Sequence, residues 1–214
     1  MPSSLKNILI IRHGQTEFNK KGIVQGSGID APLNEKGIAQ ALAFFDYYNH
    51  LKIDKIYTST LIRTHQSVKC FIEKGIVWEQ HQGLNEISWG TREGKLPDIE
   101  DNKQFNIITQ KWADGHTNLR FAAGESPNEV AQRQQDFWNK MLKQTHEENI
   151  LIAMHGRALK ILLANVLNNN LAKMDKYEHS NLCLYWLAFD YHTESLNVVK
   201  FNDTTHLKSL EITQ

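Results

Sequence analysis

The sequence predicts an α/β fold, a three-layer α/β/α sandwich whose mostly parallel central sheet carries helices on both faces. Two continuous apolar runs, Asn7–Ile11 and Ile150–Met154, have the character of strands buried on both sides, as parallel sheets require. Helix-start signals lie between the strand candidates, and strands that alternate with helices favour a parallel sheet. The 214 residues, 41% of them hydrophobic, are enough for one compact domain, which we expect to span residues 1–214.

Four shorter segments complete the predicted sheet. Lys55–Thr58 and Ile76–Glu79 are strand candidates in the first half of the chain. Leu182–Phe189 and Ser195–Phe201 are expected to form a closing pair. No repeat, low-complexity tract or linker interrupts this order, so the pattern marks no boundary between domains.

The first two predicted helices begin at polar residues that can cap them. Asn34 can cap a helix that runs through about Asn49. Its expected apolar side consists of Ala39, Leu42, Ala43 and Phe45. Ser59 can cap a second helix, which is expected to run through about Glu73.

Three later helices follow from similar signals. The segment Ser126–Glu129 combines a capping box with proline at the first helical position, and predicts a helix to about Gln144. Gly156 opens another helix, through about Leu167. The less regular stretch between the last short strand and Ser126 is expected to carry one helix, near Asp98–Trp112.

Composition argues against several classes of partner and location. The 24 basic and 24 acidic side chains balance, so no general attraction to nucleic acid or to an anionic membrane is expected. The apolar run near the N-terminus is too short for a signal peptide, and no stretch is long enough to cross a bilayer. Cys70 and Cys183 lie far apart without metal-type spacing. We therefore expect a cytoplasmic protein with two free thiols.

The first apolar run ends in Arg12-His13-Gly14. A neutral histidine at a strand end can attack phosphorus if its other ring nitrogen is held as a donor. Arg12 can bind a phosphoryl group with two hydrogen bonds, and Gly14 lets the backbone approach closely. A histidine satisfied in a turn beside a solvated arginine would give the same pattern, so this motif alone leaves both interpretations open.

Two further positions can bring positive charge to the same edge of the sheet, where ligands of open α/β sheets bind. Arg63 lies in the first turn of its predicted helix, and its side chain should point back over the end of Lys55–Thr58. His155-Gly156 follows the second apolar run, and the helix that opens there offers unpaired N–H groups to an anion. A solvated arginine and a structurally bonded histidine remain the alternatives.

Phosphate chemistry also needs an acid, and the segment Leu84–Gly94 offers two. Glu86 lies in a loop after Ile76–Glu79, where it could protonate a leaving oxygen and later deprotonate water. Glu93 is a nearby rival. Spacing alone does not choose between them.

Taken together, these motifs resemble the histidine phosphatase superfamily, in the branch that also contains the cofactor-dependent phosphoglycerate mutases. The stretch Arg12–Asn19 resembles the family's RHG-x-T-x-x-N signature. The other matching stretches, in chain order, are Gln25-Gly26, Asp30–Leu33 with Gly37, Ser59–Ser67, Leu84–Gly94, Gly124–Ser126 and His155-Gly156. Their occurrence together and in order, over nearly the whole chain, is far more specific than any one of them. The resemblance implies a phosphoglycerate mutase-like fold.

The resemblance also implies a role for each residue. His13 would be the phosphorylated nucleophile, and Glu86, rather than Glu93, the proton donor. Arg12, Arg63 and His155 would form the phosphate pocket. The substrate side would be lined by Gly14, Thr16, Asn19, Gln25, Gly26 and Gly156. No metal and no cofactor are expected, because cationic side chains would supply the electrostatic stabilisation.

The chain departs from the family pattern at two positions. Met154 replaces the serine that usually precedes the second His-Gly pair, and Lys160 replaces an arginine four residues after that pair's glycine. Neither change removes an implied catalytic group. They bear on how the surrounding residues tune the site.

The implied activity is hydrolysis of a small phosphate monoester through a phosphohistidine on His13. A phosphoglycerate mutase is the nearest alternative, but family mutases follow their glutamate with Arg-x-Tyr-Gly, whereas Glu86 is followed by Ile-Ser-Trp-Gly. A non-catalytic phospholigand-binding module should have lost the nucleophile or the acid, and both are present. A metal site built from the ten histidines lacks a His-x-x-x-His pair beside an acidic ligand.

The identity of the ester is not encoded in these motifs. In the family the irregular segment after the acid covers the pocket, which here corresponds to a lid segment at about residues 95–123. Its mixture of aromatic and basic residues is compatible with several small phosphate esters, and equally with a solvated cover. The resemblance implies a monomer or a homodimer.

Overall fold

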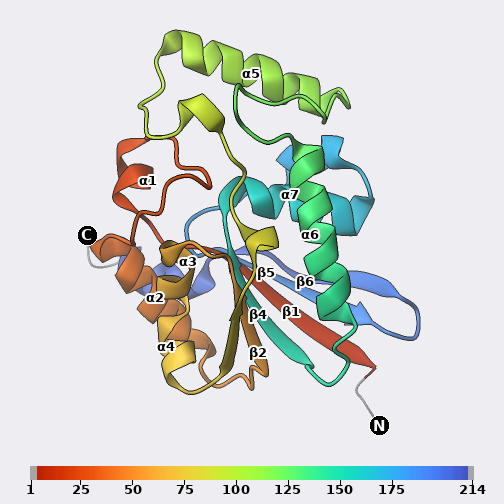
Figure 1. Ribbon diagram of the computed structural model, residues 1–214. Helices are drawn as coiled ribbons and strands as arrows, with labels where there is room; N and C mark the ends of the chain where they lie inside the picture. The colour runs from red at the N-terminus through yellow and green to blue at the C-terminus, as the bar shows by residue number, and fades with distance from the viewer. Residues whose placement is uncertain (1–3, 212–214) are drawn as a thin grey trace.

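The computed structural model describes residues 4–211 and contains one six-stranded sheet (Figure 1). The strand order is β3-β2-β4-β1-β5-β6. The strands are β1 (Leu5–Arg12), β2 (Lys55–Thr58), β3 (Val77–Gln80), β4 (Asn149–Met154), β5 (Leu184–Asp190) and β6 (Ser195–Asp203). β1, β2, β3 and β4 pair in parallel, and β5 and β6 add an antiparallel edge. The predicted mostly parallel sheet and its closing pair are confirmed.

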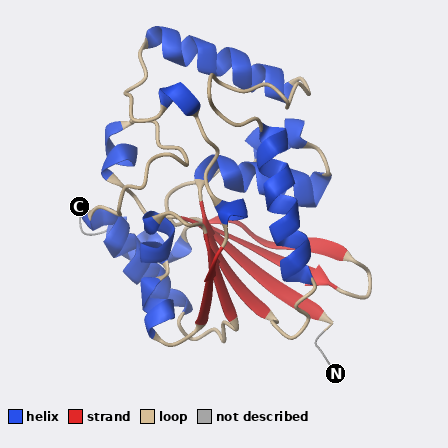
Figure 2. Ribbon diagram, viewed as in Figure 1, coloured by secondary structure: helices blue, strands red, loops and turns tan. Residues whose placement is uncertain are grey.

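Helices pack on both faces of this sheet (Figure 2). The α-helices are α1 (Glu17–Lys21), α2 (Glu35–Tyr48), α3 (Ile62–Ser67), α4 (Lys69–Glu73), α5 (Ile99–Ala113), α6 (Pro127–Leu142), α7 (Gly156–Asn168) and α8 (Lys208–Glu211). Short 3₁₀ turns are η1 (Gln82–Leu84), η2 (Gly90–Arg92), η3 (Leu171–Lys176) and η4 (Thr205–Leu207). No helix within the described residues is long and apolar enough to cross a membrane.

The two central strands explain why both apolar runs are continuous. Ile8 and Ile10 of β1 pack into one core with α6 and α7, whereas Leu9 and Ile11 pack into a second core with α2 and α4. Successive side chains of a strand point to opposite faces, so a strand covered on both sides needs an apolar residue at every position. The run at 150–154 alternates between the same two cores.

Three predicted helix starts are confirmed. The hydroxyl of Ser126 accepts from the backbone N–H of Glu129 in a reciprocal capping box, with Pro127 at the first helical position. Asn34 accepts from the N–H of Gly37 at the start of α2. Asp98 caps α5 in a second capping box, so the irregular segment carries the helix expected there.

The expected helix from Ser59 is wrong in two respects. Leu61 is the N-cap residue of α3 and has no capping side chain, and the helix breaks at Val68, which separates α3 from α4. Ser59 lies before the helix, where its hydroxyl accepts from the N–H of Leu61 and contacts a ring nitrogen of His155. Ser59, which the sequence predicts as a helix cap, therefore forms a hydrogen bond with His155 instead.

The expected apolar side of α2 is confirmed only in part, because Ala43 and Phe45 are partly buried against the second core but are not its main contacts. The helix buries Gly37, Ala41, Phe44 and Tyr48, whereas Leu42 is exposed. A glycine gives no signal in a hydrophobic pattern. The side of α2 predicted from its apolar residues therefore lies about one residue away from the side that is buried. Gly37 is buried because the helix start lies directly against the loop after His13, where a Cβ on Gly37 would be 2.1 Å from the carbonyl oxygen of Gln15.

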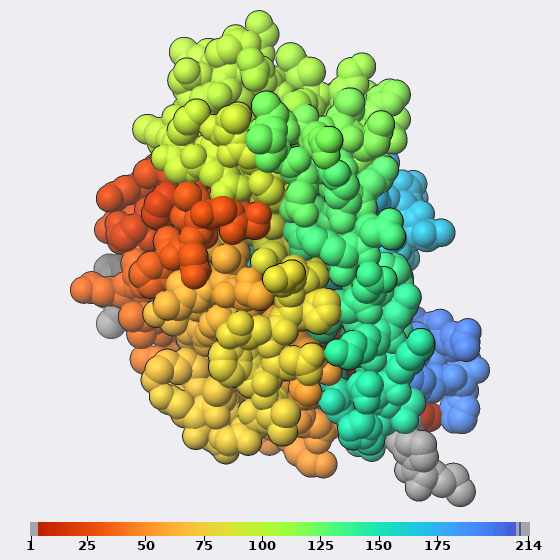
Figure 3. Space-filling model, viewed as in Figure 1, coloured from red at the N-terminus to blue at the C-terminus, as the bar shows by residue number. Residues whose placement is uncertain are grey.

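Residues 95–123 contain α5 and the turns that return the chain to α6. Figure 1 shows α5 at the end of the molecule opposite the N-terminus, and Figure 3 shows that this segment caps that end. The ring of Trp112 is fully buried against Trp89 and Phe121, and its Nε1 donates to the carbonyl of Leu119 at 2.8 Å. This aromatic cluster fastens α5 to the loop that follows Glu86.

Candidate active site

The two His-Gly pairs lie side by side because β1 and β4 are neighbours. Arg12 of β1 is in register with Met154 of β4, and the N–H of His13 donates to the carbonyl of Met154 at 2.9 Å. The chain positions that follow both strands are therefore adjacent. The imidazole rings of His13 and His155 have centroids 5.2 Å apart. That separation allows both rings to contact a single bound oxyanion.

The imidazole of His13 is held in one tautomer. Its Nδ1 lies 2.7 Å from the carbonyl oxygen of Gly14, which can only accept, so Nδ1 carries the proton. Burial lowers the pKa of His13 well below its usual range, and the guanidinium groups of Arg63 and Arg12 lower it further. The ring is therefore neutral, and Nε2 keeps its lone pair. Within residues 4–211 no hydrogen bond engages Nε2.

Arg63 is fully buried beside the second histidine, as its place in the first turn of α3 predicts. Its Nε donates to Nδ1 of His155 at 3.1 Å. Its Nη1 and Nη2 donate to the carbonyls of Ile29 and Gly26, at 2.6 and 3.2 Å. Burial lowers the pKa of Arg63 to about 10, which still leaves it charged at neutral pH. Arg63 thus places a fixed positive charge next to the two imidazoles.

Arg12 and Gln25 contain buried N–H groups that lack an acceptor. Nη1 of Arg12 donates to Nδ1 of His179 at 3.2 Å, but its Nε has no hydrogen-bond partner among the described residues. Nε2 of Gln25 is likewise buried and unpaired. A Cβ added to Gly156 would lie 3.4 Å from Nε of Arg12, so this donor faces the start of α7. Buried donors are costly when unpaired, and such atoms indicate a missing acceptor.

Glu86 lies at the start of α7. Its carboxylate accepts from the backbone N–H groups of Arg157 at 3.1 Å, Ala158 at 2.8 Å and Ile87 at 2.9 Å. The N–H groups that the sequence offered to an external anion are therefore occupied by this side chain. Its negative charge acts on both Arg12 and Arg63 and favours their charged forms. Glu86 is 6% exposed, so it lies next to the two arginines with little access to water.

Glu93, the other acid considered, has a different position. Its carboxylate accepts from the N–H groups of Gly28 and Trp89, both at 2.9 Å. A Cβ on Gly26 would lie 2.1 Å from Oε1 of Glu93, so only glycine fits there. Glu93 joins the loop that carries Gly26 to the loop that carries Glu86. Because Gly26 in turn accepts from Arg63, Glu93 acts on the site through the backbone.

The remaining predicted residues shape the loop after His13. The N–H of Gly14 donates to Oγ of Ser67 at 2.9 Å, and a Cβ there would lie 2.7 Å from the carbonyl of Gly37. The close approach expected at Gly14 is therefore to α2. Thr16 caps α1 in a capping box with Asn19, and its hydroxyl donates to Oε1 of Gln25 at 2.8 Å.

This arrangement can bind a tetrahedral oxyanion and attack it. It combines a neutral imidazole with a free lone pair, two buried guanidinium groups and unpaired N–H donors. A nearby carboxylate could exchange a proton with a leaving group. Within the described residues, no group of three or more His, Cys, Asp or Glu side chains is placed to hold a metal ion.

The comparison with known families agrees with these features. The family model described as histidine phosphatase superfamily (branch 1) matches residues 8–204. The chain belongs to this superfamily. The resemblance drawn from the sequence motifs is thereby confirmed, and the match includes every residue of the candidate site.

Several curated histidine phosphatases are similar to this chain. A mouse protein named fructose-2,6-bisphosphatase TIGAR is 28% identical over 169 residues, which are 74% of this chain and 61% of the mouse protein. Human 6-phosphofructo-2-kinase/fructose-2,6-bisphosphatase 4 is 29% identical over 205 residues, 92% of this chain and 41% of that protein. The chain thus spans less than two thirds of the length of either relative.

Several solved structures share the fold of this chain. Bacillus stearothermophilus YhfR has a TM-score of 0.81 and 25% identity, and the match covers 95% of this chain and all of the other. A putative α-ribazole-5′-P phosphatase from Escherichia coli has a TM-score of 0.79 and 21% identity, with 92% of this chain and 96% of the other covered. The α/β/α architecture is therefore that of the superfamily.

The two departures from the superfamily pattern leave the phosphate-facing atoms unchanged. The side chain of Met154 is buried in the core, and only its backbone carbonyl reaches His13. Lys160 forms an ion pair of 3.0 Å with Asp175. The same carboxylate binds Arg157 at 2.7 Å, so neither basic side chain of α7 is directed at the two histidines.

Three residues near the site were not identified from the sequence. His179 accepts from Arg12, and burial lowers its pKa to about 3, so it is a neutral partner. Asn181 donates to the carbonyl of His13 at 3.1 Å. Arg133 of α6 contacts the backbone around Glu86. Each is an isolated polar residue far away in sequence, and no local pattern marks it.

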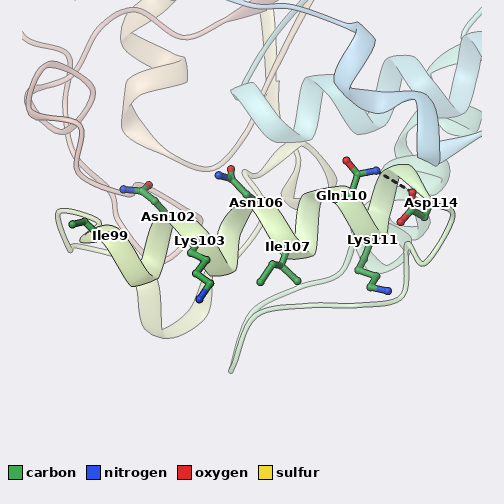
Figure 4. A pocket seen from close by; sticks show the side chains of 8 residues that line it. All are labelled: Ile99, Asn102, Lys103, Asn106, Ile107, Gln110, Lys111 and Asp114. Atoms are coloured by element: carbon green, nitrogen blue, oxygen red, sulfur yellow. Dashed lines mark hydrogen bonds between the residues drawn. The ribbon is translucent and has the colours of Figure 1, made fainter.

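A surface depression on α5 is separate from this site. Its lining side chains extend along the helix from Ile99 to Asp114, where Gln110 donates to Asp114 at 3.0 Å (Figure 4). None of the predicted site residues lines it. The candidate site is instead built at the strand ends, beneath the segment that contains α5.

Proposed function

We propose that the protein is a phosphatase that hydrolyses small phosphate monoesters through a phosphohistidine on His13. The single observation that carries this proposal is the state of the His13 ring. Its proton is held on Nδ1 by the carbonyl of Gly14, and its free Nε2 lies among buried cations. A nucleophilic nitrogen next to cations and unpaired N–H donors that can bind a phosphoryl group is what attack on phosphorus requires. Membership of the superfamily supports the same chemistry.

The ester would bind through its phosphoryl oxygens. Nε of Arg12 and Nε2 of Gln25 are the unpaired donors that these oxygens can satisfy. The guanidinium of Arg63 adds positive charge from a position fixed by its own hydrogen bonds. Because these groups are buried, they act in a medium of low dielectric constant and need little reorganisation during the reaction.

The reaction would proceed in two steps. In the first, Nε2 of His13 forms a bond to phosphorus while the bond to the leaving oxygen breaks, and Glu86 in its acid form gives that oxygen a proton. In the second, Glu86 takes a proton from water, whose oxygen attacks phosphorus and breaks the phosphorus–nitrogen bond. The charged ester bound beside Glu86 would hold this carboxyl in its acid form, so Glu86 begins and ends the cycle with a proton, and His13 begins and ends it neutral.

The part of the site that would receive the rest of the ester involves residues 95–123. We propose that residues 95–123 form a lid over the site within one domain, because Trp112 and Phe121 connect α5 to Trp89, three residues after Glu86. The names of the relatives make fructose 2,6-bisphosphate one member of an ester panel, together with simple sugar phosphates and α-ribazole phosphate.

Trapping the phosphorylated enzyme tests this proposal. The protein is mixed with ³²P-labelled ester and quenched in alkali, where phosphohistidine persists, and the label is mapped by proteolysis. We expect label on the peptide that contains His13 and none in His13→Ala. His192→Ala, which alters an exposed histidine on the turn after β5, is the matched control and should label normally.

Three results would contradict the proposal. Turnover by His13→Ala at close to the parent rate would exclude His13 as the nucleophile. Binding of ester without label or turnover would indicate a phospholigand-binding module. Label that passes from the enzyme to a second phosphoglycerate faster than to water would indicate a mutase.

A further inference from the structure

The loop that carries Glu86, residues 82–88 and here called the acid loop, is bound by a single guanidinium group. Arg133 of α6 donates through Nη1 to the carbonyls of Gly83 and Asn85, both at 2.9 Å. Its Nη2 donates to the carbonyl of Glu86 itself at 3.0 Å. Nη1 also donates to the carbonyl of Gln82 at 3.4 Å. Four carbonyl oxygens of the acid loop therefore converge on one side chain, which lies far away in sequence.

Glu125 completes this arrangement from the other side. Its carboxylate binds Arg133 through two bonds, from Nε to Oε1 at 2.9 Å and from Nη2 to Oε2 at 3.0 Å. Oε2 also accepts from the N–H of Ser88 at 2.8 Å, and the N–H of Glu125 donates to the carbonyl of Ser88 at 2.9 Å. The pair of Arg133 and Glu125 therefore holds the acid loop at 83, 85, 86 and 88.

The acid loop also lies in direct contact with the backbone of α6. A Cβ added to Gly83 would be 2.5 Å from the carbonyl oxygen of Arg133, so only glycine allows this approach. On the opposite side, Oδ1 of Asn85 accepts from the N–H and the hydroxyl of Thr60, at 2.9 and 3.0 Å. The loop is thus fixed between α6 and the end of β2.

The charge of Arg133 is needed for this geometry. Carbonyl oxygens that point toward one another repel, and a cation that donates to all of them removes the repulsion. Only a planar guanidinium with five N–H donors can reach this set of carbonyls and a carboxylate together. Without it, the four carbonyl acceptors of the acid loop would have to find other partners, and the backbone of Glu86 would move with them.

We propose that Arg133, paired with Glu125, is a positioning residue that sets where Glu86 delivers its proton. This inference rests on the proposed function, in which Glu86 protonates the leaving oxygen. It assigns to Arg133 an effect on the proton transfers of Glu86, and not on binding of the phosphoryl group, because Arg133 contacts none of His13, Arg12 and Arg63.

Leaving-group dependence separates this role from a general structural one. An alkyl phosphate such as glycerol phosphate needs a proton on its leaving oxygen, whereas 2,4-dinitrophenyl phosphate leaves as a stable anion. We expect Arg133→Ala to lower kcat/KM, which reports the step that releases the leaving group, about 100-fold for the alkyl ester and no more than about threefold for the dinitrophenyl ester. The inhibition constant of inorganic phosphate should stay within about threefold of the parent value, because the phosphate-binding residues are untouched.

Two further variants and a chemical rescue sharpen the test. Glu125→Gln keeps the shape of the carboxylate but loses its charge, and should show the same selective loss to a smaller extent. Guanidinium ions at concentrations that do not unfold the protein should restore part of the activity of Arg133→Ala, whereas ammonium ions should not. The Arg133 side chain is 22% exposed, so a small cation can reach the vacated position.

Lys140→Ala is the matched control. Lys140 lies seven residues along the same helix, its side chain is 66% exposed, and it pairs with Glu79 at 3.6 Å. This variant removes one positive charge from α6 without touching the acid loop, and both esters should be hydrolysed at the parent rate. If Arg133→Ala does not fold, Glu125→Gln and Arg133→Lys are measured with the same two esters.

The outcomes are distinguishable. A selective loss on the alkyl ester, with rescue by guanidinium, supports the role of Arg133. An equal loss on both esters in each folded variant, or no loss on either, overturns it while the proposed phosphatase activity stands. A parent protein that hydrolyses neither ester overturns the proposed function, and the role of Arg133 falls with it.

Discussion

Arg63 donates its Nε–H to Nδ1 of His155 at 3.1 Å, and this bond determines the tautomer of the second histidine. A guanidinium has no acceptor, so Nδ1 carries no proton and the ring proton lies on Nε2. Nε2 in turn donates to Oγ of Ser59 at 2.8 Å. The hydroxyl of Ser59 can then donate to Thr64 at 3.0 Å, which donates to the carbonyl of Leu61. One arginine thus orders a chain of four hydrogen bonds.

This order has a consequence for the charge of the site. Burial lowers the pKa of His155 well below its usual range, and the charge of Arg63 lowers it further. Both imidazoles are therefore neutral, and the positive charge that faces an anion comes from the arginines. The second histidine contributes the shape of the site and a fixed neighbour for His13.

Removing the Ser59 hydroxyl should disturb this chain. In Ser59→Ala the buried Nε2–H of His155 loses its acceptor, which should cost about 1–3 kcal/mol of stability. We expect kcat/KM to fall about tenfold, because the ring can rotate. Long-range ¹H–¹⁵N spectra should show a single Nε2-protonated state for His155 in the parent and mixed states in the variant. Ser59→Thr keeps the hydroxyl and should restore the parent spectrum. An unchanged spectrum in Ser59→Ala would show that these hydrogen bonds do not set the tautomer of His155.

The pH dependence of activity should reflect a neutral His13. Its pKa is lowered well below the usual histidine value, so it keeps its lone pair as the pH falls from about 7 to 5, where an ordinary histidine with a pKa of about 6.5 would protonate. We expect kcat/KM, which reports the free enzyme, to show no acidic limb near 6.5 that can be assigned to His13. If the profile does show an inflection near pH 6.5, and replacing each of the other histidines in turn leaves it in place, the inflection belongs to His13 and contradicts this assignment.

Stability should fall in acid for the same reason. His13 and His155 bind fewer protons in the folded than in the unfolded chain, so stability is fully present above about pH 6.5 and declines as the pH falls toward the folded pKa values. Each histidine should cost about 1 kcal/mol between pH 7.5 and 5.5. Denaturant unfolding at both pH values should show a smaller decline in His13→Asn than in the parent. His192→Asn, at an exposed position, should retain the parent decline.

Glu93 should affect binding more than proton transfer. Glu93→Ala removes the acceptor for the N–H groups of Gly28 and Trp89 and frees the loop whose carbonyls orient Arg63. We expect KM for a phosphate ester to rise about tenfold with kcat nearly unchanged. Steady-state kinetics of this variant are compared with Glu100→Ala, which alters an exposed acid on α5. A loss in kcat confined to alkyl esters would instead make Glu93 the proton donor.

The packing of Trp112 should decide whether residues 95–123 behave as a lid. Trp112 is fully buried against Trp89 and Phe121, and truncation of such a residue typically costs about 3–5 kcal/mol. We expect Trp112→Ala to become sensitive to proteolysis between 95 and 123 while the sheet stays protected. Ile107→Ala, at a half-exposed position on α5, should behave like the parent. Global unfolding without selective cleavage would show that the segment is not separable from the rest.

Much of the fold follows from local chemistry. The continuous apolar runs that became β1 and β4 are needed on any strand covered on both faces, and the capping box at Ser126 fixes a helix start with contacts inside one turn. The sequence predicts the α2 face only in part, and the start of the helix after Ser59 wrongly, because both depend on partners elsewhere in the chain. Gly37 is buried against the loop after His13, and Ser59 binds His155.

The candidate site divides in the same way. Its reactive residue types and their place at two strand ends were determined by the sequence, because parallel neighbouring strands bring their carboxyl ends together. The sequence did not determine the choice between Glu86 and Glu93, because both lie in one loop and differ only in the backbone N–H groups that they bind. Resemblance pointed to Glu86, and the contacts give the physical difference.

By itself, the sequence determined the order of strands and helices, most of their starting points, and which side chains could carry phosphate chemistry, because those signals act over a few residues. Only the tertiary structure decided the tautomers of His13 and His155, the neutral partner of Arg12 at His179, and the hold of Arg133 on the acid loop. Each of these depends on a hydrogen bond whose length and direction are set by chain segments that meet only when the sheet and both layers of helices have packed.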